Sequence, residues 1–293
     1  MILFDGNTEG ARLEAELKAQ VEALGRPIRI SAVLFIEDSG SQIYTQLKRE
    51  AAQRVGMEYS VEQFSLRDEA ARVVAAIDRC NRDWQVTGVI VQKPAKATWM
   101  RHTGRSEMEY QLWWKSIMGA VSPSKDVDGL HPATIASIAT VKDPESEVIL
   151  PATCRAVLHV LSIAREQLAL TSLGKIVILG KTDLVGIPLH AVLQKKGEES
   201  ELLNTKAFAS RMESGEKLLD ADVVVSATGK ANLIVPDMLR DGVLLLDVGE
   251  PRPDIQRYTY AKARFVSPVP GGVGPLTVQF LLRNALTLAT HNN

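Results

Sequence analysis

Apolar residues along the chain fall into two alternating patterns. Apolar positions three and four apart predict amphipathic helices, and uninterrupted apolar runs of about four to eight residues predict strands that are buried on both faces. Strands that alternate with helices predict βαβ units and a parallel sheet. In the first half the two patterns predict a helix at 11–24, a strand at 28–35, a helix at 41–55, a strand at 57–64, a helix at 67–78 and a strand at 86–91.

The same alternation returns in the second half. It predicts a helix at 153–167, a strand at 175–179, a helix at 185–196, strands at 201–210, 223–227 and 243–248, and a helix at 278–288. Between the halves, residues 141–147 form the most polar connector, and their proline disfavours a continuous helix there. We therefore expect an α/β protein with two domains.

Composition excludes several classes of partner. A chain of 293 residues with 45% hydrophobic content can bury two modest cores. Its 34 Lys and Arg face 35 Asp and Glu, so there is no basic excess to hold a nucleic acid, and no apolar run approaches membrane-spanning length. Cys80 and Cys154 indicate neither a disulfide framework nor a metal site. We expect a soluble, cytoplasmic protein that binds no nucleic acid, membrane or metal.

Two segments in the first half combine residues that can do chemistry. Ser41 suits a helix N-cap, and Tyr44 and Lys48 then stand four apart on one helix face, where such a pair can relay protons. Further on, the turn 123–132 combines two carboxylates, a lysine and a glycine, and carboxylates accept paired hydrogen bonds from ligand amino groups. Taken alone, a solvated helix face and a capped turn explain the two segments more simply.

Glycine-containing loops in the second half suit ligand binding. The loop 180–188 joins a predicted strand to a helix, where backbone N–H groups and the helix dipole favour a phosphate. The next strands end in the small-residue segments 226–230 and 247–249, which leave room for a cofactor at the carboxyl edge of the sheet. Near the C-terminus, three glycines and three prolines in 267–277 let another group approach closely, although an ordinary strand-to-helix turn is the simpler explanation of this loop alone.

Taken in order, these segments resemble the bifunctional methylenetetrahydrofolate dehydrogenase/methenyltetrahydrofolate cyclohydrolases. That family carries a Tyr-x-x-x-Lys helix, a glutamine after the third strand, a Lys-Asp-Val-Asp-Gly turn, a glycine loop, an Asp-Val-Gly strand end and a Pro-Val-Pro-Gly-Gly-Val-Gly-Pro loop. The last loop and the Lys-Asp-Val-Asp-Gly turn are specific motifs. The matching positions here are Tyr44 and Lys48, Gln92, 125–129, 180–188, 247–249 and 268–277.

The resemblance implies two α/β domains with the active site in the cleft between them. Residues 1–145, completed by a C-terminal helix at 276–293, would form the folate domain, and residues 146–275 would form a Rossmann-type NAD(P)-binding domain. Members of the family oxidise 5,10-methylenetetrahydrofolate and hydrolyse the methenyl product to 10-formyltetrahydrofolate, in the one-carbon metabolism that serves purine biosynthesis. The resemblance also implies a homodimer.

The resemblance assigns roles to individual residues. Lys48 becomes the catalytic lysine of the hydrolysis, Tyr44 and Gln92 orient it, Asp128 grips the pterin, and Asp126 is a structural partner. The substrate pocket is expected to include Ser41, Pro270, Gly271, Gly272 and Thr277. The cofactor is expected to contact Gly180, Lys181, Thr182, Val185, Gly186, Thr228, Gly229, Asp247 and Gly249.

Two segments of the first half depart from the family pattern. Lys93 and Lys96 put two cations at the rim of the folate pocket, where they suit either the tail of a polyglutamylated folate or simple solvation. The segment 97–121 holds three of the four tryptophans. It indicates a lid, a dimer contact or a satellite hydrophobic cluster.

The choice of cofactor and the retained activities leave alternatives. The predicted strand 201–210 lacks the family's His-Ser ending, so Lys206, Ser210 or Arg211 would have to bind the 2′-phosphate of NADP, and NAD is the alternative cofactor. A dehydrogenase-only or non-catalytic folate-binding member of the fold is the rival function. A shikimate-type dehydrogenase is a more distant one, because it has no need of the loop 270–277.

Overall fold

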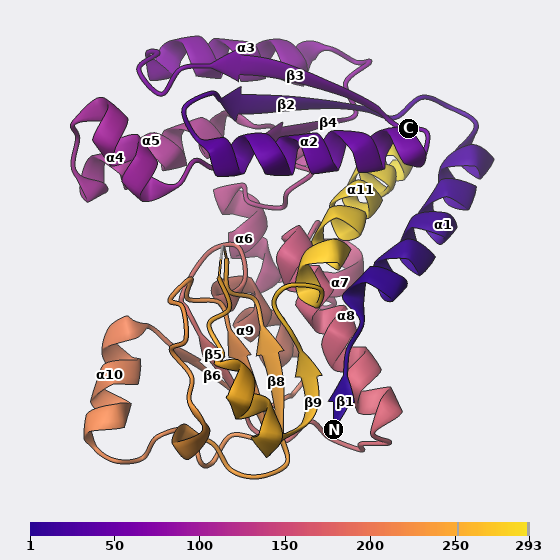
Figure 1. Ribbon diagram of the computed structural model, residues 1–293. Coiled ribbons are helices and arrows are strands. Elements are labelled where there is room, and N and C mark those ends of the chain that lie inside the picture. Colours follow the sequence, from indigo (N-terminus) through magenta and orange to yellow (C-terminus); the bar gives the residue numbers. More distant parts are fainter. Residues whose placement is uncertain (251, 292–293) are drawn as a thin grey trace. The chain divides into compact units, whose positions relative to one another are not determined.

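The computed structural model describes residues 1–250 and 252–291, and the chain divides into two compact units (Figure 1). Unit 1 comprises Met1–Arg12 and Ser137–Phe280, and unit 2 comprises Leu13–Ala136 and Leu281–Asn293. Each unit has its own parallel sheet, so the expected two-domain α/β class is confirmed. The functional division at 145/146 and 275/276 stays a prediction.

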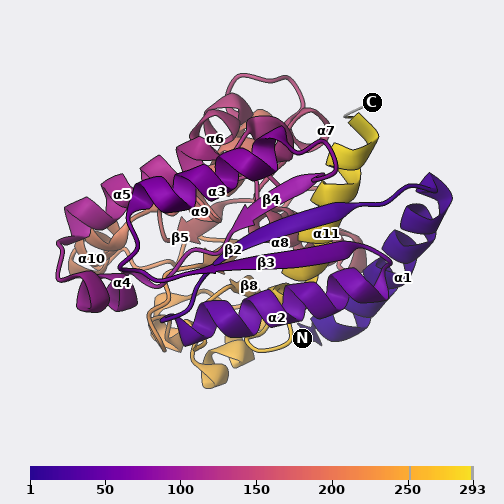
Figure 2. The same cartoon turned by 90° about the horizontal axis from the view of Figure 1, so that it is seen from above.

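Unit 2 is built on a three-stranded parallel sheet in the order β3-β2-β4. Helices α2 and α3 cover opposite faces of this sheet (Figures 1 and 2). In chain order, the elements from α1 to α6 are α1 (Gly6–Leu24), β2 (Arg29–Phe35), α2 (Ser39–Arg54), β3 (Glu58–Phe64), α3 (Ala70–Arg82), β4 (Gly88–Val91), α4 (Lys96–Thr103), α5 (Glu107–Ala120), the short 3-10 helix η1 (Pro123–Lys125) and α6 (Pro132–Ile138).

Alternation along β3 decides which side chains face which helix. Glu62 forms an ion pair with Arg79 of α3, and Phe64 belongs to the core beneath α3. Successive residues of a strand point to opposite faces, so Tyr59 and Val61 face α2.

The tryptophan-rich segment forms α4 and α5, which pack onto the α3 side of the unit 2 core. Trp99 and Trp114 are buried there together with Tyr110, and Trp113 stacks against Tyr110. Of the three alternatives for 97–121, the hydrophobic cluster is therefore the one that the structure contains.

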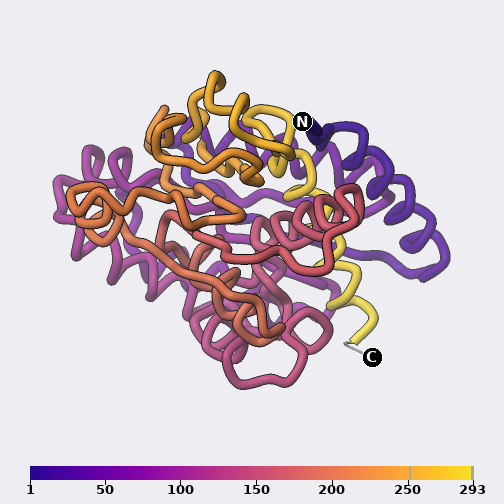
Figure 3. The backbone as a smooth tube through the Cα atoms, turned by 90° about the horizontal axis from the view of Figure 1, so that it is seen from below, coloured from indigo at the N-terminus to yellow at the C-terminus, as the bar shows by residue number. Residues whose placement is uncertain are grey.

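Unit 1 is built on a six-stranded parallel sheet in the order β1-β9-β8-β7-β5-β6. Its first strand, β1 (Ile2–Leu3), runs beside β9. Figure 3 shows the indigo N-terminus next to an orange-to-yellow stretch of the chain. The following elements are α7 (Pro144–Glu147), α8 (Ala152–Gln167), β5 (Ile176–Leu179), α9 (Gly186–Lys195), β6 (Ser200–Leu203), α10 (Thr205–Glu213), β7 (Val223–Ser226), η2 (Pro236–Met238), β8 (Val243–Asp247), η3 (Arg257–Lys262), β9 (Ala263–Ser267) and α11 (Val273–His291).

The strand order of unit 1 reverses at β5, which lies between β6 and β7. In open α/β sheets, ligands bind beyond the carboxyl ends of the strands at such a reversal. One predicted element here is wrong: the strand 201–210 ends at Leu203, because the Asn204 side chain accepts the backbone N–H of Ala207 and caps α10. None of the helices in the described part of the chain has the length and apolar content to cross a membrane.

Candidate functional site

A buried lysine, a glutamine and a carboxylate come together in unit 2. Helix α2 turns Ser41, Thr45 and Lys48 into the protein, and Lys48 is only 7% exposed. Its Nζ donates a hydrogen bond to Oε1 of Gln92 at 3.0 Å and lies 3.9 Å from Oδ1 of Asp128. The structure thus brings together three of the residues expected to be catalytic, and the fourth, Tyr44, lies half-buried one turn before Lys48.

Asp38, which sequence reasoning missed, fixes the loop that carries Gln92. Its Oδ2 accepts the Ser41 hydroxyl at 2.5 Å and the backbone N–H of Ala95 at 3.2 Å. One buried carboxylate therefore ties the start of α2 to the loop after β4. Asp38 stands at the N-cap position of α2, which is the sequence signal that could have identified it. Ser41 is 3% exposed and bonded to Asp38, which favours a structural role over direct contact with substrate.

Internal hydrogen bonds hold the Lys-Asp-Val-Asp-Gly turn. Asp126 is buried and accepts backbone N–H groups from Gly129 at 3.0 Å and from His131 at 2.7 Å, and these contacts support the structural role expected of it. Lys125 donates to the carbonyls of Cys80 and Asp83 at the end of α3. With these groups engaged, Asp128 is the carboxylate of the turn that remains for a ligand.

Two contacts anchor this turn against the sheet and the C-terminal helix. A Cβ on Gly88 would lie 2.0 Å from Cγ2 of Val127, so only glycine at this position of β4 lets the turn pack so closely. Nδ2 of Asn284 in α11 donates to the carbonyl of Val127 at 2.9 Å. Asn284 is buried inside an apolar helix and was missed by sequence reasoning, because its acceptor is a distant backbone group.

Burial dominates the electrostatics of the two aspartates. It raises the pKa of Asp128, and the ammonium group of Lys48 opposes that rise. Burial also raises the pKa of Asp126 to about 6, with a further rise from the negative charge of Asp128. A carboxyl group with a raised pKa beside a buried lysine is an arrangement that can hold and exchange protons.

The two rim lysines both have partners within unit 2. Nζ of Lys93 lies 5.0 Å from the ring centroid of Trp114, and Nζ of Lys96 lies 2.6 Å from Oε1 of Glu107. The Lys96–Glu107 pair is about half exposed on both sides, so solvent screens it and a ligand carboxylate can compete for the lysine.

The glycine/proline loop 267–277 lies in unit 1, and its last residues begin α11. A Cβ on Gly272 would lie 2.3 Å from Oγ of Ser267, and a Cβ on Gly6 would lie 1.8 Å from the carbonyl oxygen of Gly272. The close approach that these glycines permit is therefore made by the chain's own N-terminal segment. Gly271 adopts φ +92 and accepts the backbone N–H of Gly6 at 2.7 Å.

Other residues of this loop remain open to a ligand. Pro270 is exposed, and Gly271 is half-buried. Thr277, also half-buried, lies in the first turns of α11.

The glycine loop after β5 fits a dinucleotide phosphate. Gly180 adopts φ +108, and a Cβ there would lie 2.3 Å from the carbonyl oxygen of Ala227, so this loop lies directly against the end of β7. A Cβ on Gly186 would lie 1.9 Å from the carbonyl oxygen of Gly180, which lets α9 begin close to the strand. These are the tight turn and the close helix packing that a phosphate-binding loop needs. Lys181 and Thr182 are exposed on the loop, whereas the Val185 side chain is buried.

Two buried aspartates organise the ends of β7 and β8. Asp247 accepts the backbone N–H groups of Gly249 at 2.8 Å, Asp254 at 3.1 Å and Ile255 at 2.9 Å. It is 0% exposed, and burial raises its pKa to about 6. Its side chain therefore supports the loop, and the expected contact between Asp247 and the cofactor stays a prediction. The close approach of Asp254 also explains Gly249, whose Cβ would lie 2.6 Å from the Asp254 backbone nitrogen.

Asp254, another residue that sequence reasoning missed, holds Thr228. Its Oδ2 accepts the backbone N–H and the hydroxyl of Thr228 at 2.7 and 2.8 Å, and the hydroxyl of Ser226 at 2.8 Å. Gly229 follows with φ +67, a conformation that L side chains rarely adopt. Thr228 and Gly229 thus form a fixed edge beside the Gly180 loop.

Arg211 is already engaged in ion pairs, which makes it the least available of the three candidates for the 2′-phosphate. It is 9% exposed and forms ion pairs with Glu201 at 2.7 Å and with Asp220. Lys206 is exposed in the first turn of α10, and Ser210 is exposed a turn further on. Within the described residues, Lys206 forms no ion pair. A small hollow in unit 1 is lined by Leu179, Gly180, Leu203, Asn204, Thr205, Phe208, Thr228, Lys230 and Leu233.

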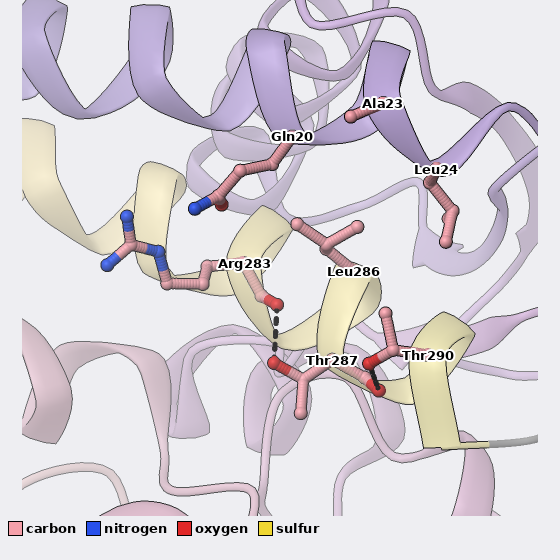
Figure 4. A pocket seen from close by; sticks show the side chains of 7 residues that line it. All are labelled: Gln20, Ala23, Leu24, Arg283, Leu286, Thr287 and Thr290. Carbon is pink, nitrogen blue, oxygen red and sulfur yellow. Dashed lines mark hydrogen bonds between the residues drawn. The ribbon is translucent and has the colours of Figure 1, made fainter.

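Unit 2 also has a groove of about 590 Å³ between α1 and α11 (Figure 4). Its lining residues are Gln20, Ala23, Leu24, Arg283, Leu286, Thr287 and Thr290. None of these belongs to the candidate site.

A parallel sheet that reverses its strand order beside a glycine loop, in the same chain as a buried lysine–glutamine–carboxylate cluster, defines a dinucleotide-dependent enzyme with an acid–base centre. Residues 4–128 match the catalytic domain of tetrahydrofolate dehydrogenase/cyclohydrolase, and residues 151–293 match the NAD(P)-binding domain of the same family. The chain belongs to the tetrahydrofolate dehydrogenase/cyclohydrolase family.

Individual relatives agree with this assignment. The chain is 32% identical to the bifunctional protein FolD of Lactobacillus helveticus over 302 residues, which covers 99% of this chain and 98% of that protein. It superposes on the crystal structure of the bifunctional FolD enzyme of Campylobacter jejuni with a TM-score of 0.85, at 27% identity and with 100% of both chains covered. The 5,10-methylenetetrahydrofolate dehydrogenase of the silkworm, Bombyx mori, gives a TM-score of 0.79 at 26% identity, with 100% of this chain and 99% of that chain covered.

The function expected from the sequence is confirmed at this level. The protein is a NAD(P)-dependent methylenetetrahydrofolate dehydrogenase and methenyltetrahydrofolate cyclohydrolase of one-carbon metabolism.

Proposed function

We propose that unit 2 binds the folate and performs the hydrolysis with Lys48, Gln92 and Asp128, while unit 1 binds the dinucleotide. The observation that carries this proposal is the position of the buried Lys48 ammonium group, 3.0 Å from the Gln92 amide oxygen and 3.9 Å from the Asp128 carboxylate. The matches to a catalytic domain at 4–128 and a NAD(P)-binding domain at 151–293 support the same division.

In the hydrolysis, water attacks the methenyl carbon and must lose a proton. Lys48 is the group that manages this proton, because it is a buried, titratable amine inside the cluster. Gln92 accepts one of its N–H bonds and so fixes the direction of the remaining ones. Asp128 accepts hydrogen bonds from the pterin and keeps the substrate carbon near the lysine.

The oxidation needs positioning more than acid–base chemistry. When bound, the nicotinamide accepts the hydride from the methylene carbon, and the folate nitrogens stabilise the cation that results. The residues of this chain contribute the orientation of the folate through Asp128 and the binding of the dinucleotide through the Gly180 loop and the start of α9. Pro270 and Gly271 are proposed to contact the substrate, since Pro270 is exposed and Gly271 is half-buried.

We propose NADP as the preferred cofactor. Lys206 is exposed in the first turn of α10, directly after β6, and Lys181 is exposed on the Gly180 loop. Cations at these places can meet a phosphate on the adenosine ribose. With Arg211 engaged in ion pairs, Lys206 is the candidate that we favour.

Several further features are proposed from family membership. They are a homodimer, a cytoplasmic location, a contribution to purine biosynthesis and the use of polyglutamylated folates. For the last, the half-exposed Lys96 offers a cation to a glutamate tail. Size-exclusion chromatography with light scattering tests the dimer, and a comparison of KM for monoglutamate and pentaglutamate substrates tests the tail.

A coupled assay on the purified protein tests the proposed function. Methylenetetrahydrofolate is supplied with NADP and, in parallel, with NAD, and methenyl formation and decay are followed by absorbance. We expect methenyl to appear faster with NADP and then to decay faster than it does without enzyme. Methenyl that forms but decays at the uncatalysed rate contradicts the proposed role of Lys48. Equal efficiency with both cofactors contradicts the proposed NADP preference.

A further inference from the structure

Tyr59 in β3 carries a buried hydroxyl without a hydrogen-bond partner, and the family resemblance assigns it no role. A buried polar group left unpaired costs about 1–3 kcal/mol, so such groups are uncommon unless a ligand or a mechanism uses them.

Strand register places the ring of Tyr59 in line with the turn that carries Asp128. Tyr59 pairs with Ile30 of β2, and Ile30 pairs with Gly88 of β4, so the three residues form one row on the face of the sheet that α2 covers. Gly88 contributes no side chain to this row, and Val127 fills its place. The residue next to Asp128 therefore packs on the same row and the same face as Tyr59.

The charges around Tyr59 agree with this placement. Burial raises the pKa of Tyr59, the negative charge of Asp128 raises it further, and Arg49 of α2 opposes the rise. Among the described residues, Asp128 has one oppositely charged neighbour, Lys48 at 3.9 Å, which is beyond hydrogen-bond distance. A buried donor without an acceptor thus lies near a carboxylate without a donor.

We propose that Tyr59 is a positioning residue of the folate site, whose hydroxyl donates a hydrogen bond to the Asp128 carboxylate, directly or through one water. The bond would hold the carboxylate in the orientation that grips the pterin and would favour its ionised form. This proposal rests on the proposed function of Asp128. It adds a residue from β3 to a site otherwise built from α2, the loop after β4 and the Asp128 turn.

The test compares Tyr59→Phe with the wild type in the dehydrogenase reaction between pH 5 and 9. Phenylalanine keeps the ring and removes only the hydroxyl oxygen, so the protein should stay folded, which a thermal melt checks. We expect the acidic limb of kcat/KM to move up by about 0.5–1 pH unit and KM for the folate to rise about fivefold, with a smaller change in kcat. Lys48 and Asp126 also act on the Asp128 carboxylate, and Arg49 acts on Tyr59, so the difference between the two proteins is what reports the Tyr59 hydroxyl.

Tyr110→Phe is the matched control, since Tyr110 is a buried tyrosine of the same unit whose hydroxyl donates to the carbonyl of Pro94 at 2.8 Å. It should lower stability without moving the acidic limb. Superimposable profiles for Tyr59→Phe and the wild type overturn the proposal, and so does an equal shift in both variants.

Calorimetric binding of tetrahydrofolate across the same pH range provides a readout that does not depend on turnover. A wild type that binds but does not react contradicts the proposed function and still tests Tyr59 through the pH dependence of binding. A wild type that does neither overturns both proposals.

Discussion

Replacing Lys48 by methionine should separate the two activities. The Lys48 ammonium lies 3.9 Å from the Asp128 carboxylate. At an effective dielectric constant of about 20, the two charges attract by about 4 kcal/mol. Without that cation, the already raised pKa of Asp128 rises further, and the carboxyl group is protonated over more of the neutral range. Folate affinity should then fall off at a higher pH than in the wild type.

The catalytic consequence is larger for hydrolysis than for hydride transfer. Loss of the proton-handling group should lower the cyclohydrolase kcat by about 10²–10⁴-fold. The dehydrogenase should change mainly in KM, since it depends on positioning. Lys48→Arg is the control: it keeps a charge beside Asp128, so the pH dependence of binding stays close to that of the wild type, but its guanidinium does not release a proton and hydrolysis is lost.

Both activities are measured on the same preparations, and folate affinity is measured by calorimetry from pH 5 to 9. Hydrolysis by Lys48→Met within about threefold of the wild type would refute the proton-handling role that general acid–base catalysis assigns to the lysine. Fully active Lys48→Arg would refute it as well.

Gly272→Ala should lower the free energy of unfolding by about 2–4 kcal/mol, because the added Cβ would lie 2.3 Å from Oγ of Ser267. Gly274→Ala is the control and should change stability little, because a Cβ there has no heavy atom within 4 Å. Equal losses of stability in thermal melts of the two variants would contradict this prediction. Because the pKa of Asp247 is raised by burial to about 6, its protonated form is favoured in the folded state, and stability should fall by up to about 3 kcal/mol as pH rises from about 4 to 6. Asp247→Asn should flatten that dependence in urea titrations, whereas parallel curves would argue against it. Lys206→Ala should raise KM for NADP about tenfold and leave NADH-forming activity with NAD unchanged; equal changes would remove Lys206 from the phosphate site.

The buried strands were the most predictable part of the fold. The apolar runs at 175–179 and 223–227 match β5 and β7 within a residue, because strands covered on both faces need apolar residues at every position. Strand β1 has two residues and owes its existence to β9 at the other end of the chain, a pairing that no local pattern carries. The error at 201–210 arose where a strand ends and a capped helix begins within two residues.

The residues of the candidate site also fall into those that the sequence predicted and those that it did not. Lys48, Gln92 and Asp128 came from motifs, and the structure brings them within hydrogen-bond or ion-pair distance. Asp38 and Asp254 were missed because their partners are distant in sequence. Asp38 accepts the backbone N–H of Ala95, and Asp254 accepts the hydroxyl of Ser226. Glycines mark close approaches along a chain, but only the three-dimensional structure shows what approaches.

The pairing of β1 with β9 has a consequence for synthesis on the ribosome. Ile2 leaves the exit tunnel long before its partner Phe265 is made. Similarly, the carbonyl of Val127 has no hydrogen bond from Asn284 until α11 has been synthesised. Strands β2, β3 and β4 can pair early, whereas the β1–β9 pair of the six-stranded sheet and the hydrogen bond from Asn284 to Val127 can form only late in synthesis. A stalled nascent chain would therefore expose an open strand edge to chaperones and carry a lysine whose carboxylate partner is not yet held in place.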